Sequence, residues 1–221
     1  MGKFTGHEWQ ALAEHVAPYR IDPDAPDPYV STFNAAVREA RYVCGRDVDT
    51  GERLDGRPVA IWAGTLVYLV LLEQIGNTLR PVGGRDLPKQ VRESAAARAL
   101  RQFAPHTTKP QREVIYALRN AFAHEFGLFN DGRGGRYRHV FTLDDEPGGP
   151  LVRWPRRRWD GTVDGVRRAT RTTVNLVAVG DLCEDVVRSV REHSNSVALR
   201  SRVPLAELQK RFAFSISDTP D

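Results

Sequence analysis

The sequence predicts a mainly α-helical protein: a helical bundle with a basic β-hairpin inserted between its last two main helices. Three observations lead to this prediction. Apolar residues recur at helical spacing over most of the chain, the segment after residue 129 changes to strand-like alternation between glycine-rich turns, and helical spacing returns near Thr170. A chain of 221 residues can build one substantial core. We therefore expect a single domain over residues 1–221, with residues 130–162 as the insertion.

The first half of the chain is predicted to form helices separated by loops rich in proline and turn residues. Helical spacing indicates a short helix from His7 to Val16 and a longer one from Tyr29 to Val43. Residues 22–28 are expected to be a loop, because each proline there moves the residue before it out of the helical region. Residues 44–58 are polar and turn-rich, so we expect either a short hairpin or a mobile loop.

The most apolar segment is predicted to be the buried central helix of the bundle. Residues 59–75 are apolar on nearly all sides, which is typical of a helix inside a core. Gly76 and Asn77 are expected to end this helix, and Glu73 near its end would need a polar partner. A third long helix is predicted from about Pro88 to Phe103.

The next helix, from Thr108 to about Gly127, contains the most informative stretch of the sequence. Thr108 and Gln111 match a capping box, in which the hydroxyl accepts from a first-turn amide and the glutamine reaches back. An apolar stripe then faces the core. It consists of Val114, Ile115, Leu118, Ala121 and Phe122.

Three polar residues interrupt this apolar pattern: Arg119, Asn120 and His124. An arginine, an amide and a histidine can together hold a phosphate and move a proton. At about 100° per residue, Asn120 and His124 lie one turn apart on one flank of the stripe, whereas Arg119 lies roughly 140° from His124. A joint site therefore requires a long curling arginine, a distorted last turn or a second copy of the chain.

The segment that follows is predicted to be the inserted β-hairpin. Residues 137–143 alternate like a strand, and residues 151–159 can form the returning strand, which Pro155 restricts to an edge. The last long helix is expected to begin near Thr170. A short helix over residues 204–212 and a frayed end complete the chain.

The net positive charge is concentrated in one segment. Residues 131–171 hold ten arginines and six acidic residues, which gives this segment +4, the formal net charge of the whole chain. Arginine pairs with phosphate and indole rings stack on bases, so the residues near the returning strand are RNA-binding candidates. They are Arg153, Trp154, Arg156, Arg157, Arg158 and Trp159. A salt-bridged surface, with the tryptophans packed on the bundle, explains the same pattern equally well.

Composition excludes several other classes of protein. Cys44 and Cys183 lie far apart and show no metal-ligand spacing, so we expect no metal site and no cofactor, and a reducing cytoplasm as the compartment. The first residues lack the apolar core of a signal peptide. The longest apolar run, residues 59–72, is shorter than the ~20 residues of a membrane span. We therefore expect no membrane partner.

The arrangement of Arg119, Asn120 and His124 near the end of a helix resembles the motif of the HEPN superfamily: arginine, a polar residue, three further residues and histidine. The resemblance makes Arg119 and His124 the defining pair and Asn120 the common polar second position. It implies a helical bundle that dimerises, so that two copies of the motif face one composite cleft. Many members of the family are metal-independent endoribonucleases of toxin, antiphage and RNA-processing systems.

The implied activity is cleavage of RNA by its own ribose 2′-OH. His124 would transfer the proton, Arg119 would stabilise the phosphorane and Asn120 would support them. The implied partners are RNA, a second copy of the chain, and an antitoxin or another defence-system protein. One position departs from the family: some toxin subgroups carry a tyrosine, a target for adenylylation, where this chain has Phe126. Phenylalanine has no hydroxyl, so we do not expect that regulation.

Two alternatives stay open at this point. The first is a non-catalytic HEPN-like module that binds RNA or a protein through the arginine-rich hairpin. The second is a structural or interaction protein, in which Arg119 and His124 are buried and paired with acidic residues of the same chain. Glu73 or Glu113 could pair with Arg119 in that case.

Overall fold

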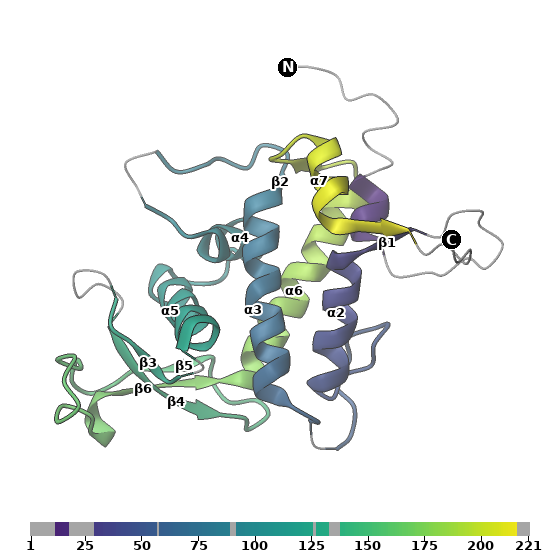
Figure 1. Ribbon diagram of the computed structural model, residues 1–221. Coiled ribbons are helices and arrows are strands. Elements are labelled where there is room, and N and C mark those ends of the chain that lie inside the picture. The colour runs from purple at the N-terminus through teal and green to yellow at the C-terminus, as the bar shows by residue number, and fades with distance from the viewer. Residues whose placement is uncertain are drawn as a thin grey trace, which may run out of the picture.

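The computed structural model describes residues 12–17, 29–56, 58–88, 92–125, 127–132 and 138–215. In this part of the chain the protein is mainly α-helical, as predicted, and it also contains a small mixed sheet (Figure 1). After a helical turn at residues 12–16, the helices are α2 (Thr32–Val43), α3 (Ile61–Thr78), α4 (Ala95–Phe103), α5 (Lys109–Glu125), α6 (Leu176–Asn195) and α7 (Leu205–Phe212). The strands are β1 (Tyr29–Ser31), β2 (Leu79–Pro81), β3 (Phe129–Asn130), β4 (His139–Asp144), β5 (Val152–Arg153), β6 (Arg171–Asn175), β7 (Leu199–Ser201) and β8 (Ala213–Ser215).

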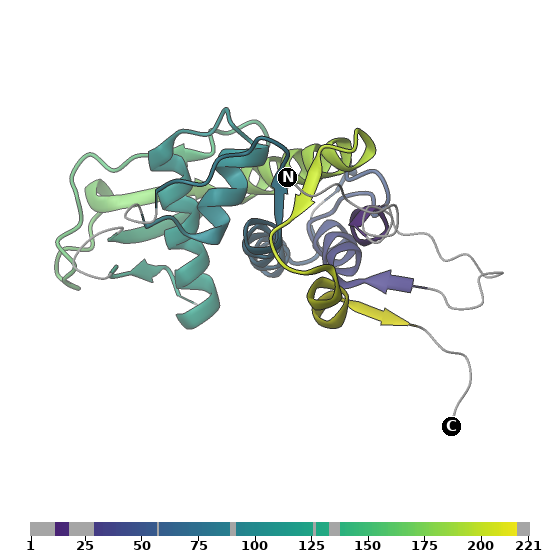
Figure 2. The same cartoon turned by 90° about the horizontal axis from the view of Figure 1, so that it is seen from above.

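Helix α3 runs through the middle of the molecule and contacts α2, α4, α5 and α6. Seen from above, α4, α5 and the sheet lie on one side of α3, and α2 with the β1–β8 ribbon lies on the other (Figure 2). The inward residues of α3 include Tyr68, Leu69, Leu72 and Ile75, which are fully buried. The prediction of a central helix is therefore confirmed.

Gly76 was predicted to end α3, but the helix continues to Thr78. Gly76 instead lies where α3 and α4 come close together. A Cβ at Gly76 would lie 1.8 Å from the carbonyl oxygen of Ala95, so only glycine lets the start of α4 approach so closely. Helix α4 begins at Ala95 and not at Pro88. The Ser94 hydroxyl marks this start, since it accepts from the amide of Ala97 at 3.2 Å.

The predicted β-hairpin is wrong in its pairing. Strand β6 lies between β4 and β5, so the order is β3-β4-β6-β5, and β4 pairs with β6 in parallel. Helical spacing predicted that the last long helix begins near Thr170, but residues Arg171–Asn175 form strand β6. The β-branched residues of this segment favour a strand. Its first residues alternate between more exposed and buried side chains. Helix α6 begins after it, because the Asn175 side chain accepts from the amide of Ala178 at 2.9 Å.

Short ribbons at the other end of the molecule correct two further boundaries. Strand β1 pairs with β8 and β2 pairs with β7, both antiparallel. Residues 29–31 are therefore a strand and not the start of a helix, and residues 213–215 are paired and not frayed. The short helix before β8 is confirmed as α7. The predictions for residues 7–11 and 22–28 lie outside the described residues.

The turn-rich segment after α2 is a short hairpin held by an acidic residue of α6. Arg46 and Arg53 form an antiparallel bridge. Both arginines bind the carboxylate of Asp181, with distances to Oδ1 of 2.7 Å from Arg46 and 3.0 Å from Arg53. Burial alone would raise the pKa of Asp181, but the hydrogen bonds from Arg53 and Arg46 and the positive charges of both arginines together hold the pKa below its usual value of 3.8.

Replacement of Asp181 by asparagine is expected to destabilise the protein at neutral pH by about 1 kcal/mol or less, because this carboxylate is partly exposed to solvent. A depressed folded-state pKa adds stability above the usual pKa, and this stability is lost as the pH falls through the folded value. The difference between wild type and variant should therefore shrink as the pH is lowered from 5 to 3. Urea unfolding across this range measures it; a difference that grows toward low pH would contradict the assignment.

Candidate functional site

Helix α5 begins with the predicted capping box. The Gln111 side-chain oxygen accepts from the amide of Thr108 at 2.8 Å, and the amide of Gln111 lies 3.4 Å from the Thr108 hydroxyl. The predicted apolar stripe, Val114 to Phe122, is buried in the core. This burial fixes the rotation of α5 and therefore the direction in which the polar residues of its last turns leave the helix.

Arg119 and Asn120 lie in contact on α5. The guanidinium Nη1 of Arg119 is 3.4 Å from the amide oxygen of Asn120. The same guanidinium forms an ion pair with Glu73 of α3, which leaves the Arg119 side chain 18% exposed and the Glu73 side chain 32% exposed. Of the two candidate partners for Arg119, the structure selects Glu73. A pairing within one chain is what the structural-protein alternative expects for Arg119.

His124 belongs to the same helix, one turn after Asn120. The backbone spacing places the two residues about 6 Å apart along the helix axis. The side chain of His124 and all of Phe126 lie outside the described part of the chain. The structure thus brings Arg119 and Asn120 together and gives the helical position of His124.

The outward face of α3 is apolar and only partly buried, which corrects the prediction of burial on all sides. This α3 stripe consists of Trp62, Ala63, Leu66, Val67 and Val70. Trp62 is 36% exposed and Val70 is 47% exposed. The Trp62 ring stacks on Phe122 of α5 with 4.7 Å between ring centroids, and at the other end the stripe adjoins the Glu73–Arg119 pair. The α3 stripe therefore lies directly beside the motif helix.

The RNA-binding candidates divide into exposed and packed residues. The arginines at 153, 156, 157 and 158 are exposed, as is Trp154, at 51%. Trp159 is only 4% exposed, and its indole N–H donates to the carbonyl of Thr162 at 2.8 Å. Arg153 pairs with Asp144 at 3.0 Å. One tryptophan is thus available to a ligand and the other is mainly part of the packing.

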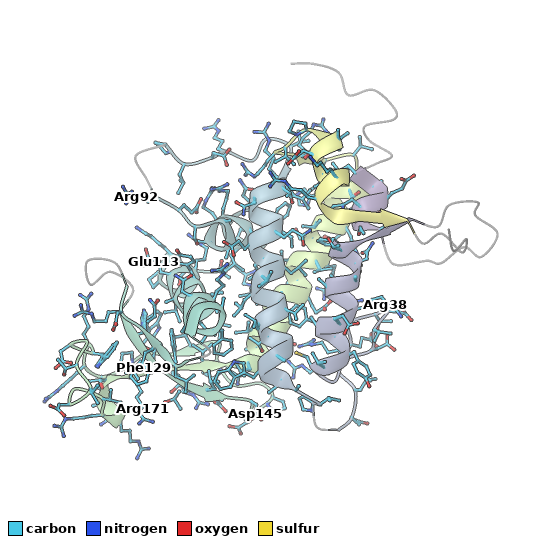
Figure 3. The ribbon with its side chains drawn as sticks, viewed as in Figure 1. Arg38, Arg92, Glu113, Phe129, Asp145 and Arg171 are labelled. Atoms are coloured by element: carbon cyan, nitrogen blue, oxygen red, sulfur yellow. The ribbon has the colours of Figure 1, made fainter. Side chains whose placement is uncertain are left out.

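A cavity of about 380 Å³ lies between the first turns of α5 and the sheet. Its lining includes Glu113, Arg138, His139, Trp154, Arg158 and Trp159. We call it the aromatic pocket. Glu113 and the sheet residues Phe129 and Arg171 lie on the same side of the molecule, and Arg38 lies on the other, beyond α3 (Figure 3). The sequence indicated Trp154, Arg158 and Trp159 as candidate binding residues. It did not indicate Glu113 or His139, because no spacing in the sequence links these two residues to the others.

His139 is held in place as a wall of this pocket. Its Nδ1 lies 3.0 Å from the Thr172 hydroxyl on the neighbouring strand β6, and its ring stacks on Phe141 with 5.4 Å between centroids. Burial, and secondly the positive charge of Arg158, lower the pKa of His139 to about 4. The ring is therefore neutral at physiological pH, with one nitrogen as donor and the other as acceptor.

No group of three or more histidine, cysteine, aspartate or glutamate side chains is placed to hold a metal ion among the described residues. Burial raises the pKa of Cys44 to about 11 and also raises that of Cys183, so both thiols stay protonated at neutral pH. Over the same described ranges, none of the helices combines the length and apolar character that crossing a membrane requires.

Comparisons of the chain with protein-family models, curated proteins and solved structures found no match.

Proposed function

We propose that the protein is a metal-independent endoribonuclease of the HEPN-like class that acts on RNA in the cytoplasm as a homodimer. The observation that carries this proposal is the contact between Arg119 and Asn120 on a helix that continues through His124. An arginine, an amide and a histidine then occupy two successive turns of one helix. Phosphodiester cleavage without a metal requires a group that transfers a proton and a positive charge at the phosphate, and His124 and Arg119 can provide them.

The reaction uses the ribose 2′-OH as the nucleophile. Its oxygen attacks the adjacent phosphorus as the O–H proton leaves, and the bond to the 5′-oxygen breaks as that oxygen gains a proton. His124 is the group with the right intrinsic pKa to take or return such a proton near neutral pH. Arg119 provides a fixed planar charge for the phosphorane, and Asn120 orients the guanidinium through the contact described above.

The α3 stripe supports a dimer. An exposed apolar patch on an otherwise buried helix is typical of an interaction surface. Because Trp62 and Glu73 contact the motif helix, a twofold axis through the stripe brings the two copies of α5 near each other. Arg119 of one chain can then face His124 of the other, which removes the angular mismatch between them on a single helix.

The ion pair with Glu73 is compatible with a catalytic role for Arg119. Glu73 is one-third exposed, so its carboxylate can return to water at small cost when a phosphate takes its place. In the free protein Glu73 holds the guanidinium of Arg119 against α3, on the side that faces α5. We propose that RNA exchanges for this carboxylate on binding.

The wild-type protein is expected to cleave RNA in the presence of EDTA, and His124→Ala is expected to reduce the rate by about 100-fold or more. Gel analysis of single-turnover cleavage measures the rates, with thermal unfolding as the check on folding. A wild-type protein that cleaves no RNA, or a variant that cleaves equally well, would refute the ribonuclease proposal.

Mixing two inactive variants tests the composite site in the same assay. A heterodimer of Arg119→Ala and His124→Ala contains one complete site only if the two residues come from different chains. Recovery of activity on mixing therefore supports a site shared between chains. Two variants that stay inactive after subunit exchange would place both residues in one chain.

The second candidate is a non-catalytic RNA-binding module. The exposure of Trp154 and of the arginines at 156–158 favours it. RNA binding that weakens steeply with salt, without cleavage by the wild type, would mark this function. An antitoxin or another defence-system protein is a proposed partner under either function.

A further inference from the structure

The aromatic pocket is built by parts of the chain that are far apart in sequence. Glu113 comes from the first turns of α5, His139 from β4, and Trp154 and Arg158 from the segment after β5. Its volume of about 380 Å³ lies within the range of roughly 300–1,000 Å³ that small-ligand sites occupy. Glu113 precedes Asn120 by seven residues, or about 10 Å along the helix axis. The pocket is thus separate from the motif but lies on the same helix.

The walls of the pocket suit a flat aromatic ligand. Trp154 is half exposed, so one face of its indole can be covered by a ligand. Trp159 is fixed by its hydrogen bond to Thr162 and by a tilted contact with Phe129 at 5.7 Å between centroids. His139 is fixed by Thr172. Trp154 thus offers the ring face on which unpaired bases stack in single-stranded RNA complexes, and the fixed rings of Trp159 and His139 make the surrounding wall rigid.

The polar groups of the pocket are of a kind that can distinguish between bases. The carboxylate of Glu113 offers only acceptors, and Lys109 of the same helix approaches it to 3.9 Å. A carboxylate pairs best with two adjacent N–H donors, and guanine presents N1–H and N2–H₂ side by side on its Watson–Crick edge. Arg158 lines the same pocket, and the exposed Arg156 and Arg157 precede it in the chain, so positive charge is available for the phosphates that flank the base.

We propose that the aromatic pocket binds one unpaired guanine of an RNA strand. The base stacks on Trp154, and its donor edge faces Glu113. This inference rests on the proposed function, because it makes the pocket a substrate subsite of the ribonuclease. A strand anchored in the pocket can follow α5 toward Asn120 and His124, so the cleaved bond should lie at a fixed number of nucleotides from the guanine.

Binding is measured on the His124→Ala protein in EDTA, so that it does not depend on cleavage. The probes are short uridine oligonucleotides with a single guanine, adenine or cytosine, and free guanosine monophosphate. The guanine oligonucleotide is expected to bind about tenfold more tightly than the others. A further Glu113→Gln change should abolish this preference, because glutamine keeps one acceptor and adds a donor. A further Trp154→Ala change should weaken all oligonucleotides by about tenfold.

The matched control is Glu192→Gln, which removes the same charge from an exposed position of α6. It should leave the guanine preference unchanged. Equal binding of all bases, or an unchanged preference after Glu113→Gln, would overturn the assignment. Free guanosine monophosphate that binds as tightly as the oligonucleotide would also overturn it, because the ligand would then be a nucleotide and not a strand.

Cleavage mapping on the active protein separates this inference from the proposed function. Wild-type cleavage with no relation to guanine, together with equal binding of all bases, refutes the pocket and leaves the ribonuclease standing. A guanine preference in binding that depends on Glu113, without cleavage by the wild type, refutes the ribonuclease and leaves a guanine-binding pocket.

Discussion

Replacement of Arg119 by lysine is expected to lower the rate of RNA cleavage by about 100-fold or more, with a small change in stability. Lysine keeps the positive charge but loses the planar set of donors that can bind two oxygens of a phosphorane at once. Loss of one such donor typically costs a factor of 10²–10³ in rate. Single-turnover cleavage at saturating protein isolates the chemical step, and urea unfolding measures the change in stability.

The matched control for this variant is Glu73→Gln. It removes the negative charge that pairs with Arg119 in the free protein and leaves the guanidinium intact. If Arg119 acts on the phosphate, Glu73→Gln should retain cleavage, because the carboxylate has to be displaced in any case. Both variants should change the free energy of unfolding by about 1 kcal/mol or less, since the pair is partly exposed.

The structural alternative makes the opposite prediction for the same three proteins. If the ion pair only joins α5 to α3, both Arg119→Lys and Glu73→Gln should affect cleavage only through the stability of the fold, and folded Arg119→Lys, which keeps the charge, should cleave at close to the wild-type rate. A rate for Arg119→Lys within a factor of three of wild type, measured on folded protein, would exclude a direct role in catalysis. The ratio of the cleavage rates of Arg119→Lys and Glu73→Gln therefore decides whether Arg119 is catalytic or structural.

The features predicted correctly from sequence are those that depend on neighbouring residues. The capping box of Thr108 and Gln111, the apolar stripe of α5 and the short helix α7 follow from contacts within a few positions. Strand β6 was missed because its identity depends on pairing with β4, about 30 residues earlier, and not on its own spacing. Gly76 was misread for the same reason, since its role is a contact with Ala95.

The candidate site shows the same division. The sequence identified the order of Arg119, Asn120 and His124, and it reduced the partner of Arg119 to two glutamates, of which Glu73 is the one in contact. It did not identify the aromatic pocket, because Glu113 and His139 meet Trp154 only after the sheet has formed. The sequence also did not indicate that the central helix would expose Trp62. When a helix is apolar on nearly all sides, its sequence does not show which side the neighbouring helices leave uncovered.

The largest effect on stability is expected at Glu184, which lies at the centre of a buried polar cluster. Its carboxylate accepts from Arg41 at 2.9 and 2.7 Å and from the Tyr68 hydroxyl at 2.6 Å. The Arg41 and Glu184 side chains are only 4% and 7% exposed. Burial alone would lower the pKa of Arg41, but the hydrogen bond to Glu184 and the negative charge of that carboxylate together raise it above its usual value. Arg41 therefore keeps its charge in the folded protein, and Glu184 is its ion-pair partner in the interior.

Replacement of Glu184 by alanine is expected to reduce the free energy of unfolding by about 3–5 kcal/mol. The variant leaves the Arg41 charge buried without its carboxylate, and such a charge is costly in a protein interior. The Tyr68 hydroxyl loses its acceptor at the same time. Urea unfolding measures the change, and the exposed Glu192→Gln on the same helix should stay within about 0.5 kcal/mol of wild type.

The double variant Arg41→Met, Glu184→Leu separates the attraction within the pair from the cost of leaving one charge alone. Apolar residues of similar volume remove both charges together, and such replacements of buried pairs are often neutral or stabilising. The double variant should therefore be more stable than Glu184→Ala, although Tyr68 still lacks its acceptor and Arg41 no longer holds the carbonyl groups of Val48 and Asp49. A double variant that is less stable than Glu184→Ala would contradict this expectation. The interactions of the pair would then contribute more to the free energy of unfolding than the cost of one unpaired charge. In that case the main role of Arg41 would be to fix the hairpin after α2 against α6.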